Sequence, residues 1–492
     1  MLMVPDRAVP LFPPRRQSSG FPMRTLPRIA RSSVLLGLLV GSPAVATEPP
    51  MEFPDRERPF VQATSPEMEI DRTSTLQGAL DEGRGGLVLG PGVFLISKPL
   101  TIDLSKGRPV AVVGHGSATL RMAGPGPALD LIGHHGGTAD PKSVTPAAGA
   151  ERMPTVDGVA ILGDHPEADG IRLARTLQAT LSRVHIRKVR HGVHLVDRNR
   201  NVTIDACHVY ENSGIGVFLD NVNLHQTLIG DTHISYCRQG GVVVRRGEVR
   251  NLHIGNCDIE SNMEPTPTES PAANVLIDLT HGPEETFAQY QNTVAEGSIT
   301  GCTLQHVGTN PHGANIRFLG REGYPVNTFS VAGNVFSDAG YGLDFDRVRS
   351  IVAADNLFFD PKPTDVRVRR SSQLVLTGNV FDPRYYEGER DQTGGLVFED
   401  VTDLTIGDSQ IAHHRNAAAS LLLTRCARFT IQGVMLRDCP AGLHLTDCER
   451  GIISGCQTSD IAASPDVRLE SCRQIVLANN LFEDPPADAA GK

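Results

Sequence analysis

Three consecutive stretches of the chain decide its fold: GVHLVDRNRNVTIDACHVYENS at 192–213, GIGVFLDNVNLHQTLIGDTHISYCRQ at 214–239 and GGVVVRRGEVRNLHIGNCDIESN at 240–262. Each stretch begins with small residues and continues with short runs of alternating apolar residues. Related stretches recur up to residue 484, and most of them follow one another after 22–25 residues. A repeat of this length predicts a solenoid, in which each coil packs against its neighbours.

The local pattern selects the kind of solenoid. Each repeat holds two or three short stretches rich in Val, Ile and Leu, and none of them keeps a helical period long enough for a helical repeat. This pattern predicts an all-β fold, a single-stranded right-handed parallel β-helix with three-strand coils and about 12–14 rungs. Residues 75–83, TLQGALDEG, predict a short N-terminal helix that caps the open end of the core.

One position recurs in the second stretch of the repeats and carries mostly small or amide side chains. The residues at this position are Cys207, Thr232, Cys257, Cys302, Asn334, Asn356, Asn379, Ser409, Val434, Cys456 and Asn480. We expect them to stack inside a turn, with asparagine hydrogen bonds from coil to coil. The nine cysteines fall on three such ladders and lack the spacing of a metal site, so we expect buried free thiols. A disulfide between neighbouring coils, such as Cys448–Cys472, is the alternative.

The N-terminal residues have the features of an export signal. Residues 23–46 combine three arginines, an apolar segment at Val34–Val40 and the cleavage motif Ala44-Val45-Ala46. They predict a signal peptide cleaved after Ala46 and export to the periplasm or the extracellular medium. Residues 1–22 fit neither signal nor fold, which suggests a misassigned start. We expect a linker at 47–70, one β-helix domain at 71–485 and a disordered tail at 486–492.

Composition excludes several classes of partner. The formal net charge is −10 at pH 7, whereas a nucleic-acid-binding protein needs a basic face for the phosphates. No apolar run is long enough to predict a membrane span. The absence of Trp argues against an aromatic platform for neutral sugars. These features favour an anionic polysaccharide, held by arginines, as the partner.

The cap TLQGALDEGRGGLVLGPGVFLISKPLTI at 75–102, the turn VVGHGSATL at 112–120 and the repeated GIxL…IxxN pattern resemble the pectate-lyase-like superfamily of right-handed β-helices. The resemblance implies a polysaccharide-active or glycan-binding protein, with an extended acidic glycan along the first strand of each coil. The catalytic signatures of the hydrolases and calcium-dependent lyases of that superfamily are absent, and Gly114-His115-Gly116 belongs to the early turn. No cofactor is predicted, and no motif supports Ca²⁺.

Alternation along the first strand of each coil indicates which side chains point away from the core and are expected to face solvent. On this face, charge is concentrated where long insertions flank the strands, between residues 261 and 395. Asp344 and Asp346 would lie roughly 6.5–7 Å apart, near the carboxyl separation of an inverting hydrolase. We therefore predict Asp344, Asp346 and Arg367 as catalytic residues. The predicted substrate-binding residues are Asp278, Arg317, Arg369, Glu399, His306, His312 and Glu260.

Three functions stay open at this point. The first is an exported glycoside hydrolase or polysaccharide lyase that binds its glycan along the outer face of the first strand stack. The second is a non-catalytic glycan-binding or structural surface protein, and the third is a uronate epimerase. A sugar-sized gap beside Asp344 and Asp346 would favour an enzyme. Saturation of both carboxylates by arginines, as in ordinary cross-strand ion pairs, would favour binding or structure.

Overall fold

The computed structural model describes residues 60–63, 70–82, 86–106, 110–137, 140–264, 271–280, 293–307, 310–359, 364–382, 394–414 and 418–486. The predicted misassigned start (1–22) and signal peptide (23–46) lie outside the described residues. So do most of the predicted linker and all but the first residue of the predicted tail. Residues 56–492 form one compact unit. No helix in the described ranges is long and apolar enough to cross a bilayer.

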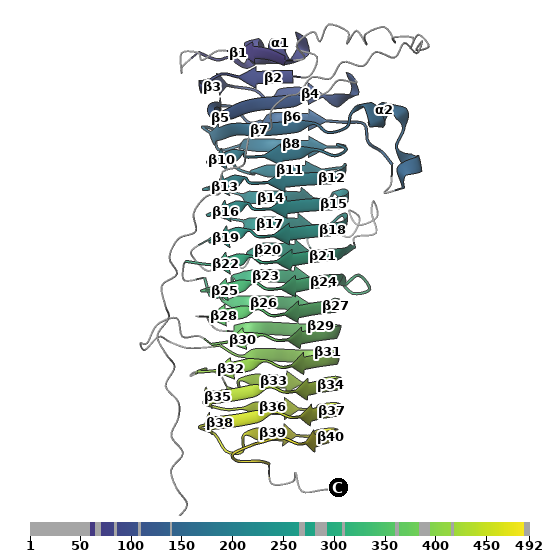
Figure 1. The fold of residues 1–492 in the computed structure, drawn as a ribbon, viewed down its shortest axis with the longest axis vertical. Coiled ribbons are helices and arrows are strands. Elements are labelled where there is room, and N and C mark those ends of the chain that lie inside the picture. Colours follow the sequence, from purple (N-terminus) through teal and green to yellow (C-terminus); the bar gives the residue numbers. More distant parts are fainter. Residues whose placement is uncertain are drawn as a thin grey trace, which may run out of the picture. The chain divides into compact units, whose positions relative to one another are not determined.

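Within the described residues, forty parallel strands wind into a β-helix with three strand stacks (Figure 1). Strands of the first stack pair with their counterparts one coil further along the chain. Its fourteen members agree with the predicted 12–14 rungs. They are β4 (Leu100–Asp103), β6 (Gly126–Ile132), β8 (Ala168–Ala174), β11 (Val193–Val196), β14 (Ile215–Asp220), β17 (Gly240–Arg245), β20 (Ala273–Asp278), β23 (Ala314–Leu319), β26 (Tyr341–Asp346), β29 (Thr364–Thr377), β31 (Leu396–Gly407), β33 (Leu421–Thr424), β36 (Leu443–Thr446) and β39 (Val467–Glu470).

The second and third stacks complete the coils, and some long strands contribute to two stacks. The second stack contains β1 (Phe60–Ala63), β2 (Gly86–Leu89), β5 (Ala111–Met122), β7 (Thr155–Gly163), β9 (Thr180–Ser182), β12 (Arg198–Asp205), β15 (Asn223–Gly230), β18 (Glu248–Gly255), β21 (Val294–Thr300), β24 (Val326–Ala332), β27 (Val348–Ala354), β34 (Ala427–Gln432), β37 (Glu449–Ser454) and β40 (Arg473–Ala478). The third contains β3 (Gly92–Ile96), β10 (His185–Arg187), β13 (His208–Tyr210), β16 (His233–Ser235), β19 (Asp258–Glu260), β22 (Thr303–Gln305), β25 (Val335–Ser337), β28 (Leu357–Phe359), β30 (Val380–Phe381), β32 (Gln410–Ala412), β35 (Met435–Cys439) and β38 (Gln457–Ile461).

The predicted capping helix is present as α1 (Thr73–Glu82). Leu76 and Leu80 on its inner side are buried in the same apolar cluster as the first strands. Its Gln77 side chain is hydrogen-bonded to both backbone groups of Thr101, at the edge of the first stack. The helix therefore covers the end of the core. Its Gln77 side chain also satisfies backbone groups at a strand edge that would otherwise lack hydrogen-bond partners.

The predicted ladder between the second and third stacks is confirmed. Asn356 Oδ1 accepts hydrogen bonds from the backbone N–H and the side-chain amide of Asn334, both at 3.0 Å. Asn379 Oδ1 accepts the two corresponding hydrogen bonds from Asn356, also at 3.0 Å. All nine cysteines are free, and eight of them are buried. Each thiol lies 3.2–3.6 Å from the carbonyl oxygen two residues before it. The cysteines thus act as small buried side chains that satisfy turn carbonyls.

One insertion departs from the regular repeat. Between β6 and β7 the chain leaves the coil and forms the short η2 (Pro141–Ser143) and α2 (Pro146–Ala150), whose N-cap is Thr145. Glu151 is buried, and its carboxylate accepts a hydrogen bond of 2.6 Å from the backbone N–H of His134. This contact ties together the described parts of the insertion, residues 133–137 and 140–154, beside the second stack, and we call these residues the 133–154 loop (Figure 1).

Candidate functional site

The predicted catalytic residue Asp344 lies on β26, between Arg317 on β23 and Arg367 on β29. Arg317 Nε donates to its Oδ2 at 2.6 Å, and Arg367 donates to both carboxylate oxygens, from Nε at 2.9 Å and Nη2 at 3.0 Å. Asp344 is only 1% exposed. Burial alone would raise its pKa, but hydrogen bonds and positive charge from Arg367 and Arg317 hold the pKa of Asp344 below its usual value. The general acid of a hydrolase instead needs a raised pKa.

Asp346, the second predicted catalytic carboxylate, is held by other arginines. Arg370 Nε donates to its Oδ1 at 2.9 Å, and Arg370 Nη2 contacts its Oδ2. Guanidinium nitrogens of Arg369 and Arg347 lie 3.5 Å from the same carboxylate. Both carboxylates are therefore saturated by arginines, which is the arrangement of a structural ion-pair network.

The outer face of the first stack is buried over several rungs. A second apolar cluster, separate from the inner core, lies on this face, and its members are no more than 6% exposed. They are Ile215, Phe218, Val243, Ala273, Leu276 and Ala314. The expectation that outward positions such as Phe218 and Leu276 face solvent was wrong, because these side chains point away from the inner core and are nevertheless covered.

Two of the predicted binding residues, Arg317 and Arg369, belong to the network around Asp344. His312 is exposed, and its backbone carbonyl accepts a hydrogen bond of 2.7 Å from Arg317 Nη2. Glu399 lies one rung beyond Arg369 and forms an exposed ion pair with Arg425. The structure thus brings Arg317, Arg369 and the His312 carbonyl together, with Glu399 at the margin.

The remaining predicted binding residues do not present free polar groups at this network. Asp278 is buried, and its Oδ1 accepts hydrogen bonds from the N–H and the hydroxyl of Thr280, at 2.8 and 2.7 Å. His306 is buried without a hydrogen-bond partner for either ring nitrogen in the described part of the chain, and burial lowers its pKa. Glu260 lies on β19 in the third stack, a different face from that of Asp344. The prediction that Glu260 contributes to the same groove was therefore wrong.

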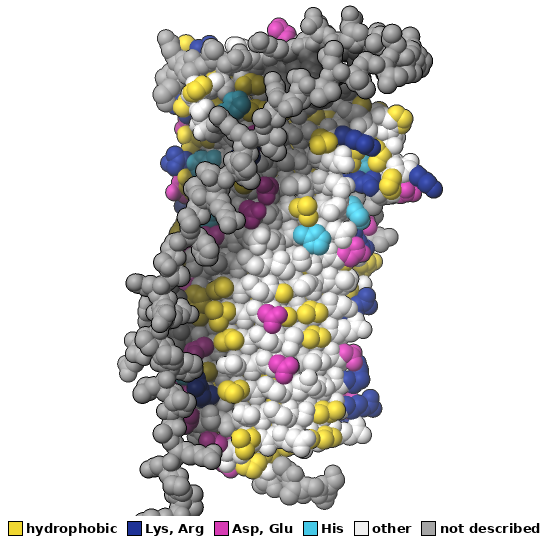
Figure 2. Space-filling model, in the orientation of Figure 1, with side chains coloured by type: hydrophobic (Ala, Val, Ile, Leu, Met, Phe, Trp, Pro, Cys, Tyr) yellow, Lys and Arg dark blue, Asp and Glu magenta, His cyan; other side chains and the backbone are white. Residues whose placement is uncertain are grey.

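The structure contains a groove on the second stack that the sequence pattern did not reveal. It encloses about 510 Å³ between residues of the 133–154 loop and side chains of β12, β15, β18 and β21, a volume within the roughly 300–1,000 Å³ typical of ligand pockets. We call it the basic groove. Its charged and ionisable lining residues are His135, Arg198, Arg200, His225, Glu248, Arg250 and Glu296. On the face seen in Figure 2, Lys and Arg side chains lie mainly toward the long sides of the molecule.

Cross-strand pairing aligns the lining residues of the basic groove. Arg200, His225 and Arg250 occupy one ladder on successive rungs, and Arg198, Asn223 and Glu248 occupy the neighbouring ladder. Asn223 Nδ2 donates to Glu248 at 3.1 Å, and Arg250 Nη2 donates to Thr293 Oγ1 at 3.0 Å. These contacts fix the side chains on a rigid sheet, as a preformed binding site requires.

His135 forms the loop side of the basic groove. It is 2% exposed, and its Nδ1 has no hydrogen-bond partner within the described residues. Burial lowers the pKa of His135, and the positive charges of Arg200 and Arg198 lower it further. Arg198 Nη1 in turn donates to the carbonyl of Gly137, which ties the loop to β12. The groove therefore places a neutral imidazole beside arginines.

The sequence missed this groove for a physical reason. The candidate site residues were predicted from the outward positions of the first strand of each coil, whereas the groove residues lie on the second strand. Its other wall is the 133–154 loop, which has no counterpart in the other repeats. The available signal was the dense run Arg198-Asn199-Arg200 together with Arg250 two coils further along.

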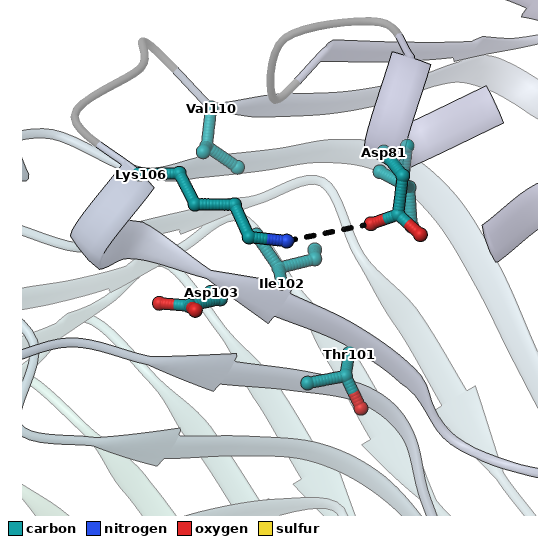
Figure 3. A pocket seen from close by; sticks show the side chains of 7 residues that line it. Asp81, Thr101, Ile102, Asp103, Lys106 and Val110 are labelled. Carbon is teal, nitrogen blue, oxygen red and sulfur yellow. Dashed lines mark ion pairs between the residues drawn. The ribbon is translucent and has the colours of Figure 1, made fainter. Parts of the chain in front are cut away.

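A second, much smaller pocket lies under the capping helix and does not provide a ligand site. Figure 3 shows Lys106 beside Asp81 of α1, with Nζ 3.8 Å from Oδ1, above Thr101 and Asp103. The cavity measures about 20 Å³, which is enough for about one water molecule. This contact joins the cap to the first coil.

Comparison with known proteins supports the fold. Residues 155–287 match the family model described as "Right handed beta helix region", which agrees with the predicted right-handed parallel β-helix. No curated protein sequence matches the chain.

Several solved structures are similar at low sequence identity. Tailspike protein 3 of bacteriophage CBA120 is 13% identical over 84% of this chain, with a TM-score of 0.49; the chain spans 59% of the length of that protein. A tailspike protein of E. coli bacteriophage HK620, solved with a pentasaccharide, is 11% identical over 84% of this chain and 78% of its own, with a TM-score of 0.47. PfbA, a surface adhesin of Streptococcus pneumoniae, is 11% identical over 84% of this chain and 87% of its own, with a TM-score of 0.41.

Proposed function

We propose that this β-helix binds an anionic polysaccharide in the basic groove. The observation that carries the proposal is the placement of Arg198, Arg200 and Arg250 around a cavity of about 510 Å³ in a chain whose net charge is −10. Guanidinium groups bind carboxylates with paired hydrogen bonds, which suits uronate sugars. The four rungs that line the groove extend over about 14 Å, so the groove accommodates a short segment of an extended chain.

The glycan hypothesis agrees with the other features of the site. Glu248 and Glu296 also line the groove, and carboxylates accept hydrogen bonds from sugar hydroxyls. A nucleic acid fits the groove less well, because its phosphates need a consistently basic face, whereas a uronate chain also offers hydroxyls that donate to Glu248 and Glu296. Export through the signal peptide at 23–46 stays part of the proposal, because an extracellular or periplasmic protein would meet such polysaccharides.

A glycan-cleaving enzyme is the second candidate. Glu248 and Glu296 give a hydrolase two carboxylates beside a ligand-sized cavity. The predicted set of Asp344, Asp346 and Arg367 has weaker support, because its carboxylates are saturated by arginines. Epimerisation of a uronate remains the further alternative, with His225 or an arginine as the base.

A panel of oligosaccharides tests the proposal. Titration calorimetry with tag-free protein should show saturable binding of oligogalacturonate or oligoalginate, weakening as NaCl is raised, and no binding of neutral maltooligosaccharides. The same mixtures should be assayed for new reducing ends and for the absorbance of unsaturated uronates. Product that disappears in Glu248→Gln but persists in Asp403→Asn, which removes an exposed carboxylate outside the groove, would establish the enzyme in the groove. Absence of binding to every anionic glycan in the panel would contradict the proposal.

A further inference from the structure

The third stack carries a cluster of metal-binding side chains away from the basic groove. His233 on β16 and Asp258 on β19 are direct cross-strand neighbours, and Glu260 lies two residues further along β19 on the same side. One ligand atom from each residue lies within 4.8 Å of the other two. His233 Nε2 and Asp258 Oδ2 are 3.4 Å apart. All three side chains are half-buried.

The two carboxylates of this cluster lack the cation that similar carboxylates have elsewhere. Outward carboxylates on other rungs, such as Asp130, Asp169 and Asp403, each bind an arginine through two hydrogen bonds. Within the described residues, neither Asp258 nor Glu260 forms an ion pair with Arg or Lys. The cluster therefore has uncompensated negative charge.

The contacts around the cluster also favour a ligand. His233 Nε2 is buried and makes no hydrogen bond within the described part of the chain, although it lies close to Asp258. Tyr236 donates its hydroxyl to Glu260 Oε1 at 3.0 Å, which orients that carboxylate. His208 lies one rung below, with its ring centroid 5.8 Å from that of His233. An orienting hydrogen bond of this kind is typical of the residues that support metal ligands.

We propose that His233, Asp258 and Glu260 bind a divalent transition-metal ion, with Zn²⁺ the best fit. One imidazole and two carboxylates suit Zn²⁺ or Mn²⁺, whereas Ca²⁺ prefers a set of oxygen ligands alone. Bonds of about 2.0–2.2 Å to a zinc ion place its ligand atoms roughly 3–4 Å apart. In the structure these atoms lie within 4.8 Å of one another, so metal binding requires the side chains to move closer together. The site lies on a different stack from the basic groove and is independent of glycan binding.

Zinc titration of tag-free, metal-stripped protein tests this site. We expect one saturable equivalent of Zn²⁺ by calorimetry that is retained in the presence of millimolar Ca²⁺ and Mg²⁺. His233→Ala and Glu260→Gln should each weaken that equivalent at least ~10-fold, because each removes one of three ligands. The matched control is His194→Ala. His194 Nε2 lies 3.3 Å from Asp220 Oδ2 in a comparable pair that is not part of a three-ligand cluster within the described residues.

The controls distinguish loss of zinc binding from loss of folding, and zinc binding at this site from zinc binding at another histidine. Far-ultraviolet circular dichroism should be unchanged in all three variants, because the substituted side chains lie on the outer surface. His194→Ala should bind zinc like the wild type. Equal zinc stoichiometry and affinity in the wild type, His233→Ala and Glu260→Gln would overturn the proposal, as would wild-type protein that binds no zinc.

Discussion

Asp344 illustrates how a residue on the outer side of a coil can still belong to the interior. Its neighbours Arg317 and Arg367 supply positive charge from the rung below and the rung above. Arg317 is itself buried and also donates to the carbonyls of Ala272 and His312. Alternation along a strand correctly predicts which side chains point away from the core. Whether those side chains are exposed depends on the segments that cover the strand, and the repeat pattern does not describe those segments.

Replacement of Asp344 by Asn should destabilise the protein strongly. The substitution leaves Arg317 buried without its counter-charge, which costs roughly 3–5 kcal/mol. Chemical denaturation monitored by circular dichroism measures the change. The control is Asp403→Asn, which breaks the exposed pair with Arg428 and should cost less than about 1 kcal/mol. Equal losses for both substitutions would contradict the buried network.

His191 should make stability depend on pH in the mildly acidic range. Burial lowers its pKa to about 4, and its Nδ1 accepts a hydrogen bond from the backbone N–H of Ile215. The unfolded chain protonates this histidine near pH 6.5, so the unfolded state binds more protons than the native state between pH 6.5 and 4. The free energy of unfolding should therefore fall as the pH is lowered through this range. His191→Gln should flatten that fall by about 2–3 kcal/mol, measured by denaturation at pH 7 and pH 4.5. An unchanged pH profile would argue against a neutral, half-buried imidazole at His191.

At the scale of the strand and turn, the ladder positions share one backbone geometry. The residue before each ladder position has a positive φ, for example 53° at Asn256 and 65° at Gly378. Asn and Gly tolerate this conformation better than other residues. The next side chain then points inward and bonds to the coil on either side, as Asn356 does. Sequence predicted this element well, because the turn and the ladder both follow from residue type at a fixed repeat position.

The asparagine ladder should be sensitive to the loss of one member. Asn356→Ala leaves the N–H of Asn334 and the carbonyl of Val331 without their partner. Each unsatisfied buried group costs about 1–3 kcal/mol, so we expect a loss of roughly 2–5 kcal/mol in thermal or chemical denaturation. Asn356→Ser should lose less, because Ser409 already fills an equivalent position with its hydroxyl as acceptor. A serine variant as unstable as the alanine variant would show that the ladder bonds contribute little.

At the scale of the whole molecule, the repeat period predicted the stack and its rung number, and residues 75–83 predicted the cap. The position of the ligand site could not be predicted in the same way. The basic groove depends on the 133–154 loop packing beside β12 and β15, and on side chains of four rungs converging. Neither feature is periodic. The Asp344 network was found from the sequence as a charged cluster, but only its contacts revealed that its carboxylates are already occupied.

The basic groove and the predicted first-stack face are alternative binding surfaces for the ligand. Titration of oligogalacturonate against Arg200→Ala, Arg250→Ala and Arg349→Ala distinguishes between them directly. Arg349 occupies the same ladder as Arg200 and Arg250 but lies outside the groove. We predict that each groove variant binds at least ~10-fold more weakly, as expected for the loss of a charged hydrogen bond, and that Arg349→Ala binds like the wild type. Unchanged affinity in both groove variants, together with loss of binding in Arg369→Ala, would contradict the account.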